Sequence, residues 1–146
     1  MDIERIHKAL TGGETARVEF KSCRDKISNS VYETVCSFSN HSGGLIILGF
    51  DDDMNLIGVN KNASVNLKKN IINTLGNKEV FFPKLTIEPE IEEYDGKTII
   101  VIDVPVSQYP VRYKNKYFDR VGDANMDIID NMELVLGLFE RKNPHL

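Results

Sequence analysis

The sequence contains no tryptophan and only two cysteines among its 146 residues. Cys23 and Cys36 are isolated thiols without CxxC spacing, which fits neither a zinc site nor a disulfide framework. The longest uninterrupted aliphatic runs, residues 45–48 and 99–102, are far too short to span a bilayer. The first residues also lack the basic and apolar regions of a secretory signal. We therefore expect a cytoplasmic protein that does not enter a membrane.

Internal repeats, low-complexity tracts and interdomain linkers are also absent from the sequence. The length is close to the common size of a domain with one hydrophobic core, and 41% hydrophobic with 27% charged residues is ordinary for a globular protein. We therefore expect residues 1–146 to form a single domain. Because the chain stops soon after a helical pattern, this domain can also be the N-terminal fragment of a longer regulator.

Charge is distributed unevenly along the chain, whose net charge of −4 by itself argues against binding to nucleic acid. Residues 86–95 contain five acidic residues and no basic one, whereas residues 111–120 contain four basic residues and one acidic residue. Only a basic face needs to meet phosphate groups. The sequence therefore predicts a molecule with an acidic side and a basic side.

Hydrophobic periodicity predicts four helices and a larger number of short strands. The expected helices cover residues 2–10, 30–40, 64–75 and a last segment after Asp130; the expected strands cover residues 17–21, 45–50, 56–59, 85–91 and 98–104, with a hairpin at 113–120. Residues 98–104 form a near-continuous apolar run and are the best candidate for a central strand. This order of elements indicates an α+β fold with a mixed or antiparallel sheet.

The sequence also predicts the N-terminal caps of two helices and the buried face of the last helix. Ser30 and Glu33 have the spacing of a capping box at the start of the second helix, and Ser64 can cap the third. In the last helix, we expect an inward face made by four apolar residues: Met132, Val135, Leu136 and Phe139. These caps and faces set how each helix should lie on the sheet.

Several motifs occur together in a characteristic order. They are Glu14-Thr-Ala-Arg-Val-Glu19-Phe-Lys21, Phe38-Ser-Asn40-His-Ser-Gly43-Gly44-Leu-Ile-Ile-Leu-Gly49-Phe-Asp51-Asp52, Ile57-Gly58-Val59, Lys97 to Pro105 with Tyr109-Pro110, and Tyr117-Phe118-Asp119-Arg120-Val-Gly122-Asp-Ala-Asn125. Each motif is weak alone, but together they cover residues 10–126 in register. In this arrangement the chain resembles the Schlafen AlbA_2 family.

The resemblance implies an AlbA-like α+β domain, with helices packed on a mixed sheet, that binds nucleic acid and often forms the N-terminal part of bacterial regulators. In vertebrate Schlafen proteins the same domain is a metal-dependent RNA endonuclease built on two glutamates and an aspartate. Glu14, Glu19 and either Asp51 or Asp52 occupy the matching positions. These residues are therefore the candidate catalytic set if the chain is a nuclease.

The carboxylates allow two interpretations on their own chemistry. If Glu14, Glu19 and Asp52 converge, they would make a hard-oxygen site suited to Mg²⁺ or Mn²⁺, which could activate water for phosphodiester cleavage. In the alternative, Glu14 lies on the surface, Glu19 pairs with Lys21 or Arg120, and residues 51–53 build a turn. We favour the alternative.

The Gly43-Gly44 turn also has two interpretations. Glycine allows positive φ and close approach of another strand, and it can expose backbone N–H groups to an anion. The segment is not a P-loop, because no Gly-Lys-Ser/Thr follows. We interpret it as a structural turn, with His41 as a surface residue rather than a ligand.

The segment 112–120 alternates basic and aromatic residues. Strand periodicity would place Arg112, Lys114 and Lys116 on one face, with Tyr113 and Tyr117 on the other. Three cations on one face can contact phosphates, and an exposed tyrosine can stack on a base. The alternative is a charged edge that prevents aggregation. The full candidate nucleic-acid-binding set is Lys21, Arg112, Lys114, Lys116, Tyr117 and Arg120.

Three functional hypotheses follow. The leading one is a nucleic-acid-binding domain of a bacterial-type transcriptional regulator, with DNA preferred over RNA as the partner. The alternatives are a metal-dependent endoribonuclease and a non-enzymatic module for protein interaction or nucleotide sensing. No cofactor is required by the first hypothesis, and Mg²⁺ or Mn²⁺ by the second. A homodimer is compatible with an exposed strand edge near Pro89.

Overall fold

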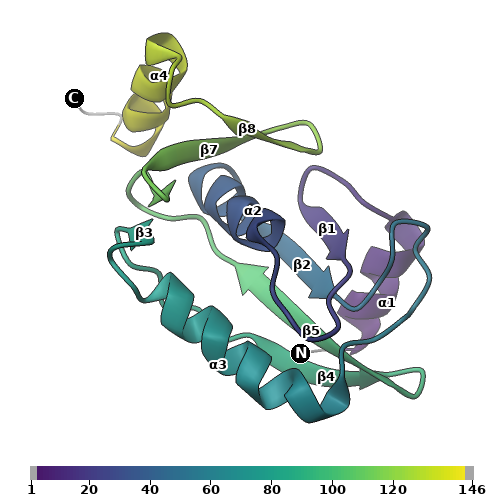
Figure 1. Ribbon diagram of the computed structural model, residues 1–146. Coiled ribbons are helices and arrows are strands. Elements are labelled where there is room, and N and C mark those ends of the chain that lie inside the picture. Colours follow the sequence, from purple (N-terminus) through teal and green to yellow (C-terminus); the bar gives the residue numbers. More distant parts are fainter. Residues whose placement is uncertain (1–2, 144–146) are drawn as a thin grey trace.

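Four helices and two four-stranded sheets make up residues 3–143, the part of the chain that the computed structural model describes (Figure 1). The helices are α1 (Ile3–Gly12), α2 (Asn29–Asn40), α3 (Ser64–Leu75) and α4 (Met132–Lys142), with a short 3₁₀ turn η1 (Lys61–Ala63). The strands are β1 (Val18–Lys21), β2 (Gly44–Leu48), β3 (Phe81–Phe82), β4 (Glu90–Tyr94), β5 (Lys97–Val104), β6 (Arg112–Tyr113), β7 (Lys116–Val121) and β8 (Ala124–Asp127). The α+β fold class is confirmed. Asp2, where the first helix was expected to begin, lies outside the described residues.

The first sheet has the order β1-β2-β5-β4 and is mixed, because β1 runs parallel to β2 while β5 runs antiparallel to both of its neighbours. In β5, Val101 pairs with Ile47 on one side and with Glu90 on the other. The prediction of a central strand over residues 98–104 is therefore confirmed. An apolar run suits this position because both faces of the strand are buried.

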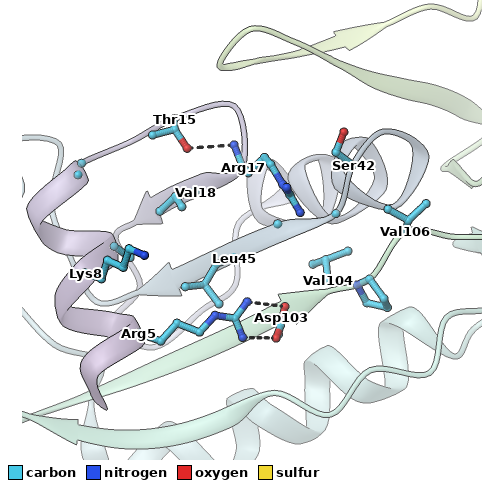
Figure 2. Close-up of a pocket in the computed structure, with 16 residues that line it drawn as sticks. Arg5, Lys8, Thr15, Arg17, Val18, Ser42, Leu45, Asp103, Val104 and Val106 are labelled. Carbon is cyan, nitrogen blue, oxygen red and sulfur yellow. Dashed lines mark hydrogen bonds and ion pairs between the residues drawn. The ribbon is translucent and has the colours of Figure 1, made fainter. Parts of the chain in front are cut away.

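Helices cover both faces of the first sheet. Ile46, Leu48, Ile100 and Ile102 join one buried cluster with residues of α2 and α3, and Leu45, Ile47, Ile99 and Val101 join a second cluster with Ile6 of α1. Arg5, an exposed residue of α1, forms an ion pair with Asp103 of β5, with 2.6 Å between Nη1 and Oδ2 (Figure 2). α1 therefore covers one face and α2 with α3 the other.

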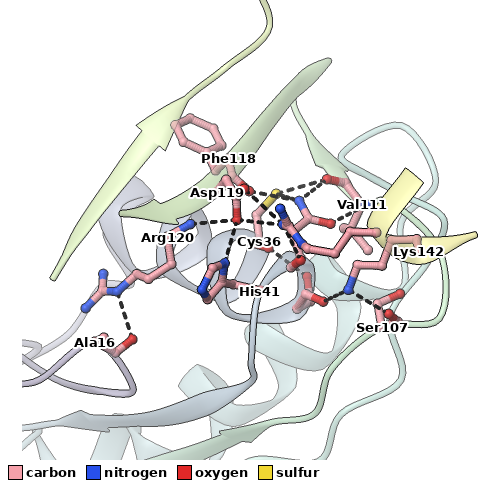
Figure 3. A network of polar contacts seen from close by, with 12 residues as sticks. Ala16, Cys36, His41, Ser107, Val111, Phe118, Asp119, Arg120 and Lys142 are labelled. Carbon is pink, nitrogen blue, oxygen red and sulfur yellow. Dashed lines mark hydrogen bonds and ion pairs between the residues drawn. The ribbon is translucent and has the colours of Figure 1, made fainter. Parts of the chain in front are cut away.

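The second sheet is antiparallel throughout, in the order β3-β6-β7-β8, and it contacts α2 from the side opposite the first sheet (Figure 1). Asn40, fully buried at the end of α2, holds the two parts together. Its Nδ2 donates to the carbonyl oxygens of Val111 and Phe118, and its Oδ1 accepts from the Val111 N–H (Figure 3). A single side chain thus satisfies three buried backbone groups, two of Val111 just before β6 and one of Phe118 in β7.

Two predicted helix caps differ in the structure. α2 begins at Asn29 and its N-cap is Ser28, so Ser30 lies inside the first turn and shares a hydrogen bond with the Ser28 hydroxyl at 2.9 Å. The Ser30–Glu33 capping box is therefore not formed. Ser64 is the first residue of α3, and its hydroxyl donates to the Lys61 carbonyl instead of capping the helix. Because the 3₁₀ turn η1 directly precedes α3, the N-cap lies one residue earlier, at Ala63.

Two predicted strands are shorter than expected. Residues 56–59 make only an isolated bridge between Phe50 and Leu56, because the N–H groups of both Ile57 and Gly58 donate to the Gly49 carbonyl and bend the chain. The strand predicted at residues 85–91 begins only at Glu90, directly after Pro89, which cannot donate to a strand neighbour.

The apolar face of α4 also differs from the prediction. Leu138 is the fully buried residue of this helix, whereas Met132 and Leu136 keep 75% and 59% of their surface exposed. The last turn of α4 is instead fixed by polar contacts. Arg141 donates to the Asn40 carbonyl, and Lys142 donates to the carbonyls of Ser39 and Ser107. Within residues 3–143, no helix is long and apolar enough to cross a membrane.

Candidate nucleic-acid interface

The basic hairpin forms as predicted, but its turn reverses the expected alternation. β6 and β7 are joined by Lys114 and Asn115, both with positive φ (51° and 65°), as in the tight turns that suit hairpin twist. Arg112 pairs with Tyr117, and Tyr113 pairs with Lys116. Cross-strand partners share a face, so Tyr113 and Tyr117 lie on opposite faces. The prediction that Arg112, Lys114 and Lys116 share one face is therefore wrong, because two turn residues interrupt the period of two.

The outward face of the second sheet carries an aromatic and cationic row instead. Phe82 pairs with Arg112 across β3 and β6, and Arg112 pairs with Tyr117 across β6 and β7. Phe82 is 53% exposed, and the Arg112 guanidinium lies 4.9 Å from the centre of its ring. Tyr117 contacts Phe139 of α4 edge-on, at 5.6 Å between ring centres. We call Phe82, Arg112 and Tyr117 the outer row.

Two lysines lie at the tip of the hairpin, Lys114 in the turn and Lys116 on the face opposite the outer row. Lys114 Nζ lies 3.1 Å from the side-chain oxygen of Asn29 and 5.3 Å from the Tyr113 ring centre. Lys116 Nζ lies 3.5 Å from Asp127, which is a long ion pair between partly exposed groups. Such pairs contribute little to stability, so both ammonium groups are free to exchange these partners for a phosphate.

Arg120 belongs to the predicted binding set but is 3% exposed. Its Nε donates to the Ala16 carbonyl (Figure 3). Its Nη2 donates to Glu19 at 2.8 Å and to the Thr15 carbonyl, and its Nη1 donates to Asn125. Four of its five N–H donors are thus taken up inside the protein. Arg120 therefore joins β7 to the segment before β1, and we correct its predicted role from phosphate contact to structural support.

Glu19 is the buried partner of this arginine, and the predicted pairing of Glu19 with Lys21 or Arg120 is found with both. Lys21 Nζ lies 3.2 Å from Glu19 Oε1, on the side away from Arg120. Because its charge is already shared with this carboxylate, Lys21 is a weaker candidate for phosphate contact than the hairpin lysines. A carboxylate held by two cations in a buried site needs no metal ion to offset its charge.

The other candidate carboxylates do not gather around Glu19 to complete a metal site. Burial and the neighbouring charge of Glu19 raise the pKa of Glu14, so these two groups do influence each other. Asp51 instead accepts hydrogen bonds from the backbone N–H groups of Asp53 and Asn55, which lower its pKa, and it builds the 51–55 turn. Among residues 3–143, no three acidic, histidine or cysteine side chains are grouped so that they could hold a metal ion.

The Gly43-Gly44 turn is occupied by internal contacts. The Gly43 N–H donates to the Phe38 carbonyl at the end of α2, and a Cβ on Gly43 would lie 2.7 Å from the Val104 carbonyl oxygen. Close packing, with φ at +73°, accounts for the glycine. Next to it, the exposed His41 lies 3.2 Å from Asp119, which also accepts from Arg141 (Figure 3).

Sequence reasoning missed Phe82 and Asn40. Phe82 precedes a proline in a two-residue strand that periodicity cannot detect, although the Phe81-Phe82-Pro83 triplet is a local signal. Asn40 stood within the family-like motif, but no pattern in one sequence could indicate that a helix-terminal amide binds a second sheet.

The two sheets around α2, together with the cation-rich hairpin, define a compact α+β domain of mixed topology. Residues 14–128 match the family model described as "Schlafen, AlbA_2". The chain belongs to the Schlafen AlbA_2 family, which confirms the resemblance found in the sequence. Within the set of curated proteins, a sequence search finds no match.

Two solved structures have a similar fold. The DIP2311 protein from Corynebacterium diphtheriae has a TM-score of 0.62 and 16% identity, covering 86% of this chain and 29% of that protein. The N-terminal domain of an ATP-dependent DNA helicase RecG-related protein from Nitrosomonas europaea has a TM-score of 0.61 and 24% identity, covering 84% of this chain and 90% of that domain. At these identities, the likeness shows the fold alone. The present chain spans less than a third of the length of the first structure.

Proposed function

We propose that this chain is a nucleic-acid-binding domain of a bacterial-type transcriptional regulator, with DNA as its partner. The observation that carries the proposal is the outer row of Phe82, Arg112 and Tyr117, with Lys114 and Lys116 at the tip of the same hairpin. The cations can neutralise backbone phosphates, and the exposed ring of Phe82 can stack on an unpaired base. Membership of the Schlafen AlbA_2 family and the DNA helicase-related name of the Nitrosomonas neighbour agree with this proposal.

The first test is a binding titration of the purified chain with fluorescent duplex DNA, single-stranded DNA and RNA. Replacing Arg112, Lys114 and Lys116 by Ala should weaken binding roughly tenfold or more, since each hydrogen bond to a charged group contributes about 1.5 kcal/mol or more. A charge-matched control replaces Lys61, Lys69 and Lys97, exposed residues of η1, α3 and β5. An equal loss in both variants would show that only total charge matters, and the hairpin would not be the interface.

A second candidate function is the metal-dependent endoribonuclease, which is favoured by one observation. Glu14 and Glu19 lie close enough for the charge of Glu19 to raise the pKa of Glu14. RNA incubated with the chain and Mn²⁺, with EDTA as the control, tests this candidate. Cleavage that requires the metal and disappears in Glu19→Gln would favour the nuclease, provided that the variant stays folded. RNA that is retained but not cleaved would favour the binding domain.

The pairing of two copies is also a proposal. β4 is an edge strand of the first sheet and begins directly after Pro89, so its outer backbone groups are available to a second copy. Its acidic residues oppose such pairing at low salt. Size-exclusion chromatography with light scattering, at low and high salt, should show a dimer only where the charges are screened. A monomer under both conditions would exclude this edge.

A further inference from the structure

A pocket of about 670 Å³ lies on the α1 side of the first sheet (Figure 2). α1 covers the β5 end of this face but ends at Gly12, and the chain returns to the sheet only at Val18. The space left open is bounded by α1, the starts of β1 and β2, and the segment after β5. Its size falls within the range of about 300–1,000 Å³ that is usual for small-molecule sites.

The floor of this pocket is apolar. Val18 and Leu45 contribute from neighbouring strands, Ala9 from α1, and Val106 from the chain after β5. Val106 is 53% exposed, although it lies beside a buried sheet face. A flat ring placed on this floor would cover apolar surface that solvent now reaches, which is a favourable process.

Cations line the pocket in excess of acidic residues. Arg5, Lys8 and Arg17 face it together with a single carboxylate, Asp103. Arg5 is already neutralised, because its two terminal nitrogens lie 2.6 and 3.3 Å from the two oxygens of Asp103. In the part of the chain that the structure describes, the side chains of Lys8 and Arg17 have no hydrogen-bond or ion-pair partner. The pocket thus keeps two uncompensated positive charges in a protein whose net charge is −4.

The two free cations stand on different elements, with the apolar floor between them. Lys8 lies on α1 and Arg17 on the segment before β1, and Val18 and Leu45 lie between them in the view of Figure 2. The backbone N–H of Arg17 is held by the Thr15 hydroxyl at 3.1 Å, and its carbonyl accepts from the Leu45 N–H. The backbone that carries the guanidinium is therefore held in place, while its N–H donors remain free to bind two oxygens of a phosphate.

We propose that this pocket binds a nucleotide, with the phosphate between Lys8 and Arg17 and the base on the adjoining part of the floor, toward Leu45 and Val106. A nucleoside phosphate combines a flat apolar ring with a charged group, as the pocket combines an apolar floor with two unpaired cations. The nucleotide can be free, or it can be the phosphorylated end of a nucleic-acid chain. The proposal does not rest on the hairpin interface, because the hairpin belongs to the other sheet.

The test measures binding of AMP by isothermal titration calorimetry to the full chain and to the variant in which Lys8 and Arg17 are both replaced by Ala. We expect AMP to bind and the variant to bind roughly tenfold more weakly or worse, because two charged hydrogen-bonding groups are lost. The control variant replaces Lys69 and Lys97, exposed lysines outside the pocket, and should bind AMP as the parent does. Adenosine, which lacks the phosphate, should bind more weakly than AMP to the parent.

A pair of oligonucleotides distinguishes the two sources of the ligand. A short single strand with a 5′ phosphate and the same strand with a 5′ hydroxyl are titrated into the parent and the Lys8/Arg17 variant. A preference for the 5′ phosphate that the variant loses assigns the pocket to chain ends, and AMP binding without that preference assigns it to free nucleotides.

The proposal is overturned if millimolar AMP does not bind and the 5′ phosphate makes no difference, or if the Lys8/Arg17 variant binds both ligands like the parent. The hairpin proposal is unaffected by either result. Conversely, loss of duplex binding in the Arg112/Lys114/Lys116 variant should leave AMP affinity unchanged, so failures of the two proposals can be told apart.

Discussion

Arg120 is the residue on which most connections between distant parts of the chain converge. Its guanidinium carbon lies 4.8 Å from the centre of the Phe38 ring. Its nitrogens donate to Glu19, to Asn125 and to two carbonyls of the segment before β1. Asn125 in turn donates to Thr34 of α2. Because the side chains of Arg120 and Glu19 are shielded from water, removing the guanidinium would leave the buried carboxylate with Lys21 as its remaining cation and would take a donor from two carbonyls.

We therefore expect Arg120→Met to lower the free energy of unfolding by about 3–5 kcal/mol, the usual cost of breaking a buried ion pair. Urea denaturation followed by circular dichroism measures this change. Arg112→Met is the matched control, since Arg112 is partly exposed and stacks only on Phe82; it should change stability by about 0.5 kcal/mol or less. If the two variants were equally stable, the network around Arg120 would not support the fold as described.

Both cysteines illustrate how burial suppresses ionisation. Burial raises the pKa of Cys23 to about 11 and of Cys36 to about 12, from a usual value of 9.0. The neutral thiols are therefore favoured in the folded state, and the stability that this difference provides is fully present below pH 9. It is lost as the pH rises toward the folded pKa values, because only the unfolded thiols ionise in that window.

The expected result is an alkaline loss of stability that depends on Cys36. Between about pH 8 and about pH 10.5, the free energy of unfolding should fall less in Cys36→Ala than in the parent. The quantity compared is the decrease in the free energy of unfolding between the two pH values in each protein, because Cys36→Ala also loses packing at both pH values. Thiol reagents should label the native chain only as fast as it opens. Rapid native labelling at pH 8 that is lost in Cys36→Ala would mean that Cys36 is not buried.

At the scale of elements, β5 is the strand that joins β2 and β4 in the first sheet. Val101 is 1% exposed and lies between β2 and β4. Val101→Asp would bury an unpaired charge and should cost several kcal/mol, a large part of the roughly 5–15 kcal/mol available to a domain. Val121→Asp makes the same exchange at a position in β7 that is 51% exposed, and it should leave the melting temperature nearly unchanged. A soluble Val101→Asp chain that melts with the parent would contradict this packing.

The elements also show how far one sequence predicts a structure. Amphipathic periodicity identified α1, α2 and α3, and the apolar run at residues 98–104 identified the central strand, because burial on one or two faces leaves a direct trace in composition. The exact start of α2 at Asn29 and the face of α4 left no such trace. Both depend on contacts between segments far apart in sequence, such as Arg141 with Asn40.

Site prediction was limited by the same cause. The basic and aromatic composition of the hairpin was visible in the sequence, but its faces depend on a two-residue turn at Lys114 and Asn115. A shift of one residue in such a turn moves every later side chain to the other face. The pairing of Glu19 with Lys21 or Arg120 was predicted, but the sequence left it beside a metal site as an alternative, because Arg120 lies 101 residues from Glu19. The choice between the two required the fold.

At the scale of the whole molecule, the most acidic and the most basic segments of the chain lie on different sheets. The acidic segment around β4 lies at the edge of the first sheet, whereas the cations of the hairpin lie on the second sheet. If the chain binds nucleic acid through the hairpin as proposed, the acidic segment repels the nucleic acid and the hairpin attracts it, so the field of the protein orients it before contact. A net charge of −4 is therefore compatible with binding through one face.

This separation makes a quantitative prediction for the salt dependence of binding. If Arg112, Lys114 and Lys116 each neutralise one phosphate of duplex DNA, replacing all three by Ala should flatten the slope of log K against log salt by roughly 0.9 per lost contact. The slope is measured by fluorescence anisotropy over a series of salt concentrations. The Lys61/Lys69/Lys97 control removes the same total charge and should keep the parent's slope, because counterions are released only where phosphates are contacted. An unchanged slope in the hairpin variant would place the DNA on another face of the molecule.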